Sequence, residues 1–209
     1  MKIYQYSLGQ LQANCYFVVN EKNCLIIDPG DEAPFILEEI HKKKLNPVAI
    51  LATHGHFDHL MAVGEIQQSF NIPLYISEKD NFLLSNLNQS AEYFLNYKPI
   101  ILPILKINNF KERNYLKIKN FKFKIIFTPG HTPGSVCFYF PGDNILFTGD
   151  TLFKRGIGRY DFSYSNKNQL IKSLGTIFRL HLKTKILPGH GEGSTLEKEK
   201  DFICQNFLV

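Results

Sequence analysis

The chain has 209 residues, of which 44% are hydrophobic and 21% charged, and its formal net charge is +5. This composition is too apolar for a disordered chain, and the length lets a single domain, residues 1–209, bury a core without disulfides or structural metals. No apolar run approaches the roughly 18–20 residues of a membrane-spanning helix, and the N-terminus lacks the apolar segment of a signal peptide. We therefore expect a cytoplasmic protein without a membrane anchor, with its four cysteines reduced.

Short runs of β-branched and aromatic residues alternate with amphipathic segments along the chain. The runs predict strands at Ile3–Tyr6, Cys15–Val19, Cys24–Ile27, Val48–Ala52, Leu74–Ile76, Tyr115–Ile118, Phe121–Phe127, Ser135–Phe140, Ile145–Phe147 and Lys185–Leu187. The amphipathic segments predict helices at Ala33–Lys44, Leu60–Phe70, Lys79–Leu87, Asn168–Leu180 and Leu196–Phe207, whereas residues 88–113 give no clear pattern. Hairpins mixed with helices predict an α+β fold in which sheets pack together and helices lie outside.

The positive charge is concentrated between residues 106 and 124. Seven Lys or Arg residues and one acid give this stretch a net charge of +6, which leaves −1 for the rest of the chain. Its lysines alternate with apolar residues, as in Lys122-Phe123-Lys124. This is the pattern of a half-buried hairpin with a solvated face, and lysines also protect exposed strand edges from aggregation. We therefore do not expect a nucleic-acid partner.

The segment Thr53-His-Gly-His-Phe-Asp-His59 contains three of the seven histidines and an aspartate. Imidazole and carboxylate groups are ligands that suit zinc, iron and manganese. The two-residue spacing of His54 and His56 is not that of a zinc-binding helix, and it fits a loop in which alternate side chains turn toward one point.

Other predicted strands also end in residues of these types. The runs VAILAT, FKIIFTPG, NILFTG and TKILPG lead to His54, His131, Asp150 and His190, and the run CLIID ends in Asp28. If these strand ends lie along one sheet edge, the side chains converge on a single site. This repeated pattern predicts a metal site more specifically than any one motif does.

The chain resembles the metallo-β-lactamase-fold hydrolases in the segments THGHFDH (53–59), TPGHTPGS (128–135), FTGDTLF (147–153) and LPGHG (187–191). The resemblance implies an αββα sandwich of two mixed β-sheets with helices on the outer faces and a binuclear metal site at one edge. By position it implies that one metal is held by His54, His56 and His131, that the second is held by Asp58, His59 and His190, and that Asp150 bridges them. Asp28 matches an acid that orients the ligands. We expect two divalent ions, zinc in the first instance, with iron or manganese as alternatives.

Within these hydrolases, the segment GDTLFKRGIGRYDF (149–162) is most similar to the glyoxalase II group, which cleaves thioesters such as S-lactoylglutathione. The resemblance implies attack by a metal-bridging hydroxide oriented by Asp58, and glutathione contact by Arg159. Only 19 residues follow His190, so we expect the C-terminal helical domain that also contacts glutathione in this group to be absent.

Several alternatives remain open from the sequence. Lys154 is equally consistent with a substrate contact and a surface ion pair, and Tyr160 with a wall of the site and rim packing. An iron-dependent persulfide dioxygenase would show similar ligand motifs. A metallo-β-lactamase-fold nuclease is disfavoured because such enzymes carry additional domains that hold the polynucleotide. The acyl group, the metal and the oligomeric state are not determined by the sequence.

Overall fold

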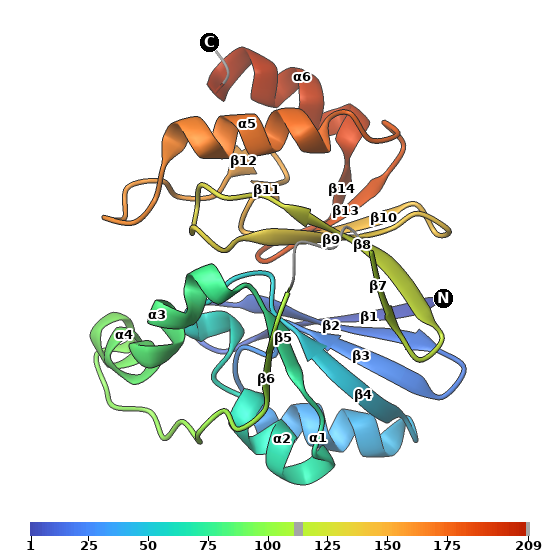
Figure 1. The fold of residues 1–209 in the computed structure, drawn as a ribbon, viewed down its shortest axis with the longest axis vertical. Coiled ribbons are helices and arrows are strands. Elements are labelled where there is room, and N and C mark those ends of the chain that lie inside the picture. Colours follow the sequence, from blue (N-terminus) through green and yellow to red (C-terminus); the bar gives the residue numbers. More distant parts are fainter. Residues whose placement is uncertain (111–114, 208–209) are drawn as a thin grey trace.

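The computed structural model describes residues 1–110 and 115–207. Two six-stranded mixed sheets pack face to face, and helices cover both outer faces (Figure 1). The predicted α+β class and the αββα sandwich are confirmed.

The first sheet contains the N-terminal half of the chain. Its strands lie in the order β1 (Lys2–Leu8), β2 (Ala13–Asn20), β3 (Asn23–Ile27), β4 (Asn46–Leu51), β5 (Leu74–Ile76) and β6 (Ile107–Asn109). The first three strands form antiparallel hairpins, whereas β3 through β6 are parallel neighbours. The carboxyl ends of β3 and β4 therefore lie side by side.

The second sheet has the corresponding arrangement in the C-terminal half. Its strands lie in the order β14 (Ser194–Thr195), β13 (Lys185–Pro188), β10 (Ile145–Gly149), β9 (Val136–Phe140), β8 (Phe121–Phe127) and β7 (Tyr115–Ile118). The strands β10 and β13 are parallel, and the other pairs are antiparallel. A small hairpin, β11 (Leu152–Phe153) and β12 (Gly156–Ile157), follows β10.

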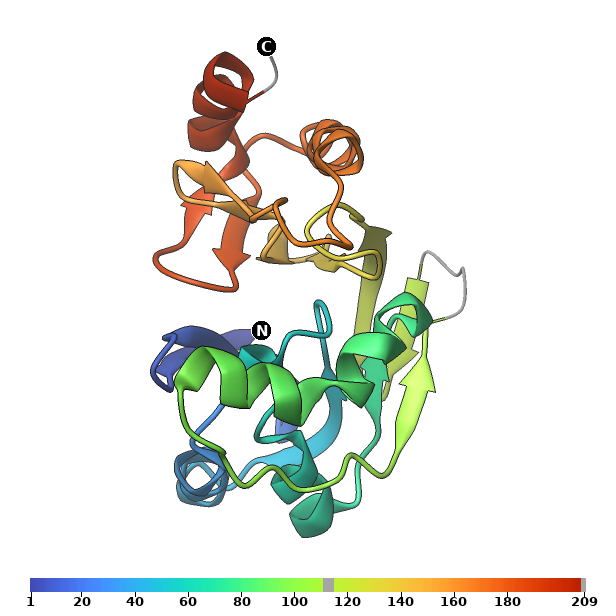
Figure 2. The same cartoon turned by 90° about the vertical axis from the view of Figure 1, so that its left-hand side faces the viewer.

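The helices divide between the two sheets (Figure 1). The outer face of the first sheet carries α1 (Ala33–Lys42) and α2 (Val63–Phe70), and that of the second carries α5 (Lys167–Ile177) and α6 (Leu196–Phe207). Two shorter helices, α3 (Asn81–Ser85) and α4 (Leu87–Leu95), lie at one side of the first sheet (Figure 2). They face the segment that joins β12 to α5 in the other half.

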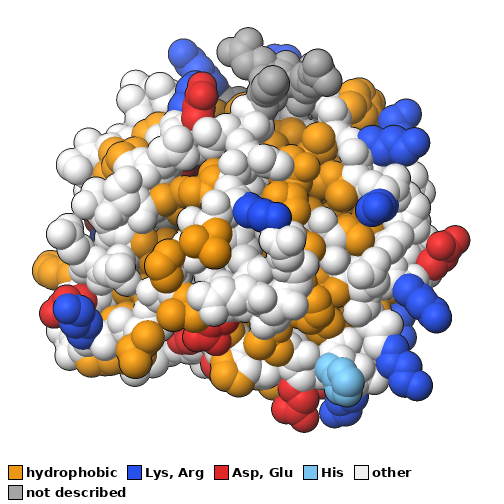
Figure 3. Space-filling view, turned by 60° about the horizontal axis from the view of Figure 1, so that its bottom comes forward, with side chains coloured by type: hydrophobic (Ala, Val, Ile, Leu, Met, Phe, Trp, Pro, Cys, Tyr) orange, Lys and Arg blue, Asp and Glu red, His pale blue; other side chains and the backbone are white. Residues whose placement is uncertain are grey.

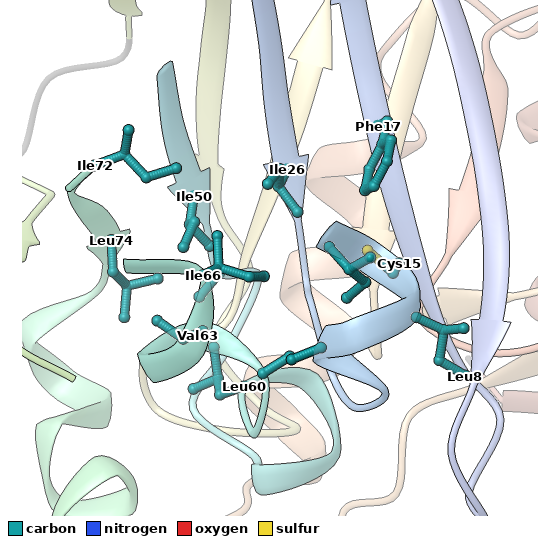
Figure 4. Packing of buried hydrophobic residues seen from close by; sticks show 14 of the residues in the cluster. Leu8, Cys15, Phe17, Ile26, Ile50, Leu60, Val63, Ile66, Ile72 and Leu74 are labelled. Carbon is teal, nitrogen blue, oxygen red and sulfur yellow. The ribbon is translucent and has the colours of Figure 1, made fainter. Parts of the chain in front are cut away.

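The central strands are buried on both faces, which explains their continuous apolar runs. Along β2, Phe17 points into the cluster beneath α1 and α2, whereas Tyr16 and Val18 point into the cluster between the sheets. Figure 4 shows the first cluster, in which Ile26 and Ile50 from the strands lie near Ile66 of α2. Successive residues of one strand thus point to opposite faces of the sheet, so a single apolar run contributes to both apolar layers.

The sequence-based boundaries were wrong in several places. The helix expected at Lys79–Leu87 is a 3-10 turn followed by α3, and α4 occupies the stretch that showed no pattern. The helix expected from Leu60 begins at Val63, because a 3-10 turn over Phe57–His59 precedes it. The strands β6, β11, β12 and β14 were not predicted, because none of them contains more than two apolar residues.

The lysine-rich hairpin is confirmed over 115–127. Phe121, Phe123 and Ile125 are buried between the sheets, whereas Lys117 and Lys122 are exposed. Lys111 and Arg113 fall outside the described residues.

Figure 3 turns the outer helices of the first sheet toward the viewer. On this face the Lys and Arg side chains lie apart from one another among apolar side chains. Within the described ranges, no helix is long and apolar enough to cross a membrane.

Candidate metal centre

Five strands end at one edge of the sandwich, and each is followed by a histidine or an aspartate. In the first sheet, Asp28 follows β3 and His54 follows β4. In the second sheet, β8, β10 and β13 lead to His131, Asp150 and His190. The antiparallel bridge between Ala13 and His190 joins the two halves at this edge. The strand ends predicted from the sequence to carry ligand-type residues thus meet in space.

The side chains at this edge form three overlapping groups, each with its ligand atoms within 4.8 Å of one another. The groups are His54–His56–His131, His54–His59–Asp150 and Asp58–His59–His190. Within the first group, His56 Nδ1 lies 3.0 Å from His54 Nε2 and 3.1 Å from His131 Nε2. In the third, the Nε2 atoms of His59 and His190 are 3.3 Å apart. All seven side chains expected to bind metal are therefore brought together.

Each of the five histidines also has a polar partner for the ring nitrogen that points away from the cluster. The partners are Thr53 Oγ1 for His54 (3.1 Å), Tyr164 Oη for His56 (2.8 Å), Asp28 Oδ2 for His59 (3.2 Å), the Arg159 carbonyl for His131 (2.8 Å) and the Leu11 carbonyl for His190 (3.0 Å). Such contacts fix the ring orientation and tautomer of metal-binding histidines. The ring orientations therefore direct one nitrogen of every histidine to the cluster.

Asp28 connects the ends of β3 and β4. Its Oδ1 accepts a hydrogen bond from Thr53 N (2.7 Å), and its Oδ2 accepts one from Thr53 Oγ1 (2.6 Å) while facing His59. The residue lies in the left-handed region, with φ at 50°, which aspartate tolerates better than most residues. Asp28 is thus placed to orient other residues of the cluster.

Asp80 was not identified from the sequence, yet it connects two of the loops that carry histidines. Its fully buried carboxylate accepts hydrogen bonds from Gly55 N (2.9 Å), Thr132 Oγ1 (2.7 Å) and Gly134 N (2.7 Å). Gly55 lies between His54 and His56, and the other two donors follow His131. A Cβ at Gly134 would lie 2.5 Å from the Asp80 carboxyl carbon, so this approach requires glycine. Asp80 therefore fixes the first sheet's histidine loop against that of the second.

The cluster has the properties of a cation site. Asp150 Oδ1 is buried and finds no hydrogen-bond donor among the residues that the structure describes. Burial opposes protonation of His59, but the carboxylates of Asp58 and Asp150 outweigh it and raise the His59 pKa to about 10. A bound cation would experience the same negative field and would supply the missing partner of Asp150. The residues present therefore fit a metal ion.

The protonation states of His54, His56 and Asp58 suit metal binding. Burial and the neighbouring histidines lower the His54 pKa well below its usual value, and burial lowers the His56 pKa to about 3. Burial raises the pKa of Asp58, but His59 and His190 outweigh it, so the net shift is downward. Neutral imidazole and ionised carboxylate are the forms that bind metals.

A cavity of about 390 Å³ opens onto the cluster. His56, Asp58, His131, Asp150 and His190 line it. Its remaining lining is mainly apolar and comes from both halves, consisting of Leu11, Phe57, Leu83, Phe94, Phe153, Ile157 and Phe162, together with Gly55, Ser90, Arg159 and Tyr164. A volume of this size suits a small-molecule substrate.

The three residues expected to bind substrate occupy different places. Arg159 lines the cavity, where its guanidinium forms two hydrogen bonds with Asp161 (2.9 and 2.8 Å) and lies 4.5 Å from the Phe162 ring centre. Lys154 lies outside the lining and pairs with Glu192 at 2.5 Å, which is the surface-pair alternative. Tyr160 is 39% exposed and also lies outside the lining.

Removing metal with a chelator is expected to lower the thermal stability of the protein. An ion at a thousandfold excess over its Kd stabilises the folded state by about 4 kcal/mol. For a domain of 150–250 residues, this corresponds to a fall in Tm of about 8–16 °C. Differential scanning calorimetry before and after chelation, and after restoring zinc, measures the change. An unaltered Tm in protein whose metal loss is verified would contradict a metal bound by these residues.

Residues 8–190 match the metallo-beta-lactamase superfamily, and the chain belongs to this superfamily. A hydroxyacylglutathione hydrolase, GloC of Haemophilus influenzae, is 39% identical over 193 residues, which cover 90% of each chain. The superfamily and the His/Asp cluster identify the chain as a metal-dependent hydrolase that uses divalent ions.

Two solved structures share the whole architecture. The BLEG-1 B3 metallo-beta-lactamase superimposes with a TM-score of 0.90 at 33% identity, covering 96% of this chain and 97% of that one. TTHA1623 in a di-iron-bound form superimposes with a TM-score of 0.86 at 34% identity, covering 94% and 96%. Proteins with this architecture therefore include one named as a B3 metallo-beta-lactamase and one that binds two iron ions.

Proposed function

We propose that the protein hydrolyses thioesters, with S-lactoylglutathione as the representative substrate. The observation that carries this proposal is the convergence of seven His and Asp side chains, five of which line a small-molecule cavity. The similarity to a hydroxyacylglutathione hydrolase supports the choice of a thioester over other acyl compounds.

In this proposal His54, His56 and His131 would hold one ion, Asp58, His59 and His190 would hold the second, and Asp150 would be available to either. Two such ions lower the pKa of a shared water and polarise a carbonyl group. Asp58 lines the cavity, and its Oδ2 lies 3.3 Å from His190 Nε2. The pKa of Asp58 is held low, so its carboxylate is ionised and can orient the attacking water by accepting a hydrogen bond from it.

No acylated side chain is expected during turnover. The only aliphatic hydroxyl or thiol side chain among the described residues lining the cavity is Ser90, and no base is hydrogen-bonded to it there. A nucleophilic serine needs an adjacent base, so direct attack of water on the thioester is favoured. Rapid acid quenching followed by mass spectrometry of the intact protein measures this. A covalent acyl adduct that forms and decays at the turnover rate would exclude direct attack.

The replacement Arg159→Ala is expected to raise KM for glutathione thioesters with a smaller change in kcat. Arg159 lines the cavity without belonging to the cluster, so its loss removes binding present in both ground and transition states. Steady-state kinetics with S-lactoylglutathione measure the effect, and Lys183→Ala, an exposed lysine outside the lining, is the control. Unchanged kinetics for Arg159→Ala would mean that glutathione is recognised elsewhere or not at all.

The proposed reaction is tested by assaying protein of measured metal content against a panel of substrates. The panel contains S-lactoylglutathione, an uncharged thioester, a lactone, a β-lactam and a phosphodiester. Thioester hydrolysis well above the others is the expected result. Oxygen consumption with glutathione persulfide, in protein containing a single iron, would instead indicate a dioxygenase. Preferred cleavage of the β-lactam or phosphodiester would overturn the proposal.

A further inference from the structure

We propose that α3 and α4 form a binding wall for an apolar, aryl-sized acyl group of the substrate. This inference rests on the proposed thioester hydrolysis and names the acyl group that it favours. The wall consists of Leu83 from α3, Phe94 from α4 and Phe57 behind Phe94, and all three line the cavity. None of them has a role in the proposed chemistry.

The packing at the wall leaves one aromatic surface accessible. Phe94 stacks on Phe57 with ring centres 5.8 Å apart and ring planes at 17°. Phe57 and Leu83 are only 5% and 6% exposed, whereas Phe94 remains 45% exposed while lining the cavity. Phe94 thus has a rigid support on one side and apolar surface available to a ligand. A flat apolar group can stack on such a ring.

The opposite half of the cavity is also aromatic. The ring centre of Phe162 lies 5.2 Å from that of His56 and 5.9 Å from that of His131. Phe162 stacks on Tyr164, and Tyr164 contacts Phe82 of α3 with ring centres 5.3 Å apart. Helix α3 therefore contacts the segment before α5 at one side of the cavity. Figure 2 shows how the two halves face each other.

The charges around the cavity favour an uncharged acyl group. Arg159 is the only Lys or Arg among the described lining residues, and both of its hydrogen bonds to Asp161 must be shared or broken to bind a second carboxylate. Arg159 also lies in the half of the cavity that is built on the second sheet. Because Arg159 is proposed to contact glutathione, the thiol part of the substrate would occupy this half. The wall in the first half is then available to the acyl part, which it can recognise by burial of apolar surface.

The inference is tested by comparing acyl groups on the same thiol. S-mandeloylglutathione carries a phenyl ring where S-lactoylglutathione carries a methyl group, and the α-hydroxyl is retained. The kcat/KM of each is divided by its rate constant for hydrolysis by hydroxide, which removes the intrinsic difference in reactivity. A corrected preference of about ten- to a hundredfold for the mandeloyl compound is expected, on the scale of apolar pocket discrimination. A corrected ratio of one or less would overturn the inference.

A matched pair of variants locates the effect. Phe94→Ala is expected to reduce the corrected preference at least fivefold, because it removes the accessible ring of the wall. Tyr97→Ala, at a 48% exposed aromatic position after α4 and outside the lining, is expected to leave both the preference and the turnover unchanged. Circular dichroism verifies that both variants fold. An unchanged preference in Phe94→Ala, or an equal loss in both variants, would contradict the assignment to this wall.

A binding measurement separates failure of this inference from failure of the proposed function. S-phenacylglutathione and S-acetonylglutathione are thioethers that differ in the same phenyl and methyl groups and cannot be hydrolysed as thioesters. Isothermal titration calorimetry is expected to show at least tenfold tighter binding of the phenacyl compound, and loss of that difference in Phe94→Ala. Tighter phenacyl binding without turnover of any thioester would overturn the proposed function alone, whereas equal binding would overturn the wall.

Discussion

Replacing His54 with alanine is expected to abolish thioester hydrolysis while leaving the fold intact. His54 belongs to two of the three candidate metal-binding groups, so its loss removes a possible ligand from both. Loss of outer partners of metal ligands reduces metal affinity or activity by about 10–100-fold, and loss of a ligand itself is expected to exceed this, at about 1,000-fold or more. His54 is outside the three apolar clusters that stabilise the sandwich, so the secondary structure should persist.

The measurements are kcat/KM, metal content by plasma emission spectrometry and circular dichroism. Asp58→Ala should lose activity to a similar degree, because Asp58 belongs to the third group and lines the cavity. His41→Ala on the exposed surface of α1 is the matched control and should retain full activity and metal. Near-normal turnover in His54→Ala or Asp58→Ala, with metal content verified, would refute the site.

The second large effect is expected from Asp80→Asn, at a residue that contacts no substrate. The amide is nearly isosteric but places a donor opposite at least one of Gly55 N and Gly134 N, which both donate to the carboxylate. The two histidine loops then lose part of their connection. Metal affinity is expected to fall about 10–100-fold, as for other residues that orient metal ligands.

Competition between the metal-free protein and a chromophoric chelator measures this affinity. Glu78→Gln, an exposed carboxylate in the same 3-10 turn, is the control and should bind metal normally. Thr132→Val, which removes one donor to Asp80, should give a smaller loss in the same direction. A structural role without influence on the centre would lower the Tm of Asp80→Asn but leave its metal affinity unchanged, and this outcome would exclude Asp80 as a positioning residue.

The candidate metal ligands could be predicted because their pattern is local. Each follows an apolar strand, and parallel strands such as β3 and β4 bring their carboxyl ends to the same edge. A run such as VAILAT before His54 therefore indicates both a buried strand and the place where its polar continuation emerges. The alternation of lysine with apolar residues over 115–127 likewise predicted the exposed face of the hairpin correctly.

The residues that surround these ligands could not be predicted in the same way. Asp80 and Tyr164 have no motif, since each is an ordinary residue that acts through partners 25 or more positions away. The wall on α4 comes from a stretch in which no pattern was recognised. Leu87, Ala91 and Leu95 are buried at four-residue spacing, but the exposed aromatic residues Tyr93 and Phe94 place apolar side chains on the rest of the helix as well. Lys154 lies within the segment 149–162 that resembles the glyoxalase II group, yet it pairs with Glu192 outside the cavity.

The sequence pattern by itself therefore indicated the α+β class and residues able to bind metal, because strand periodicity and strand-end residues are properties of short segments. The resemblance of its motifs to the metallo-β-lactamase-fold hydrolases indicated the superfamily and the sandwich. Only the tertiary structure decided how the histidine rings are oriented, which residues line the cavity and where apolar surface remains available to a substrate. Those features depend on contacts between the two sheets and the helices beside them, such as that of Phe82 with Tyr164. They arise only when distant parts of the chain pack together.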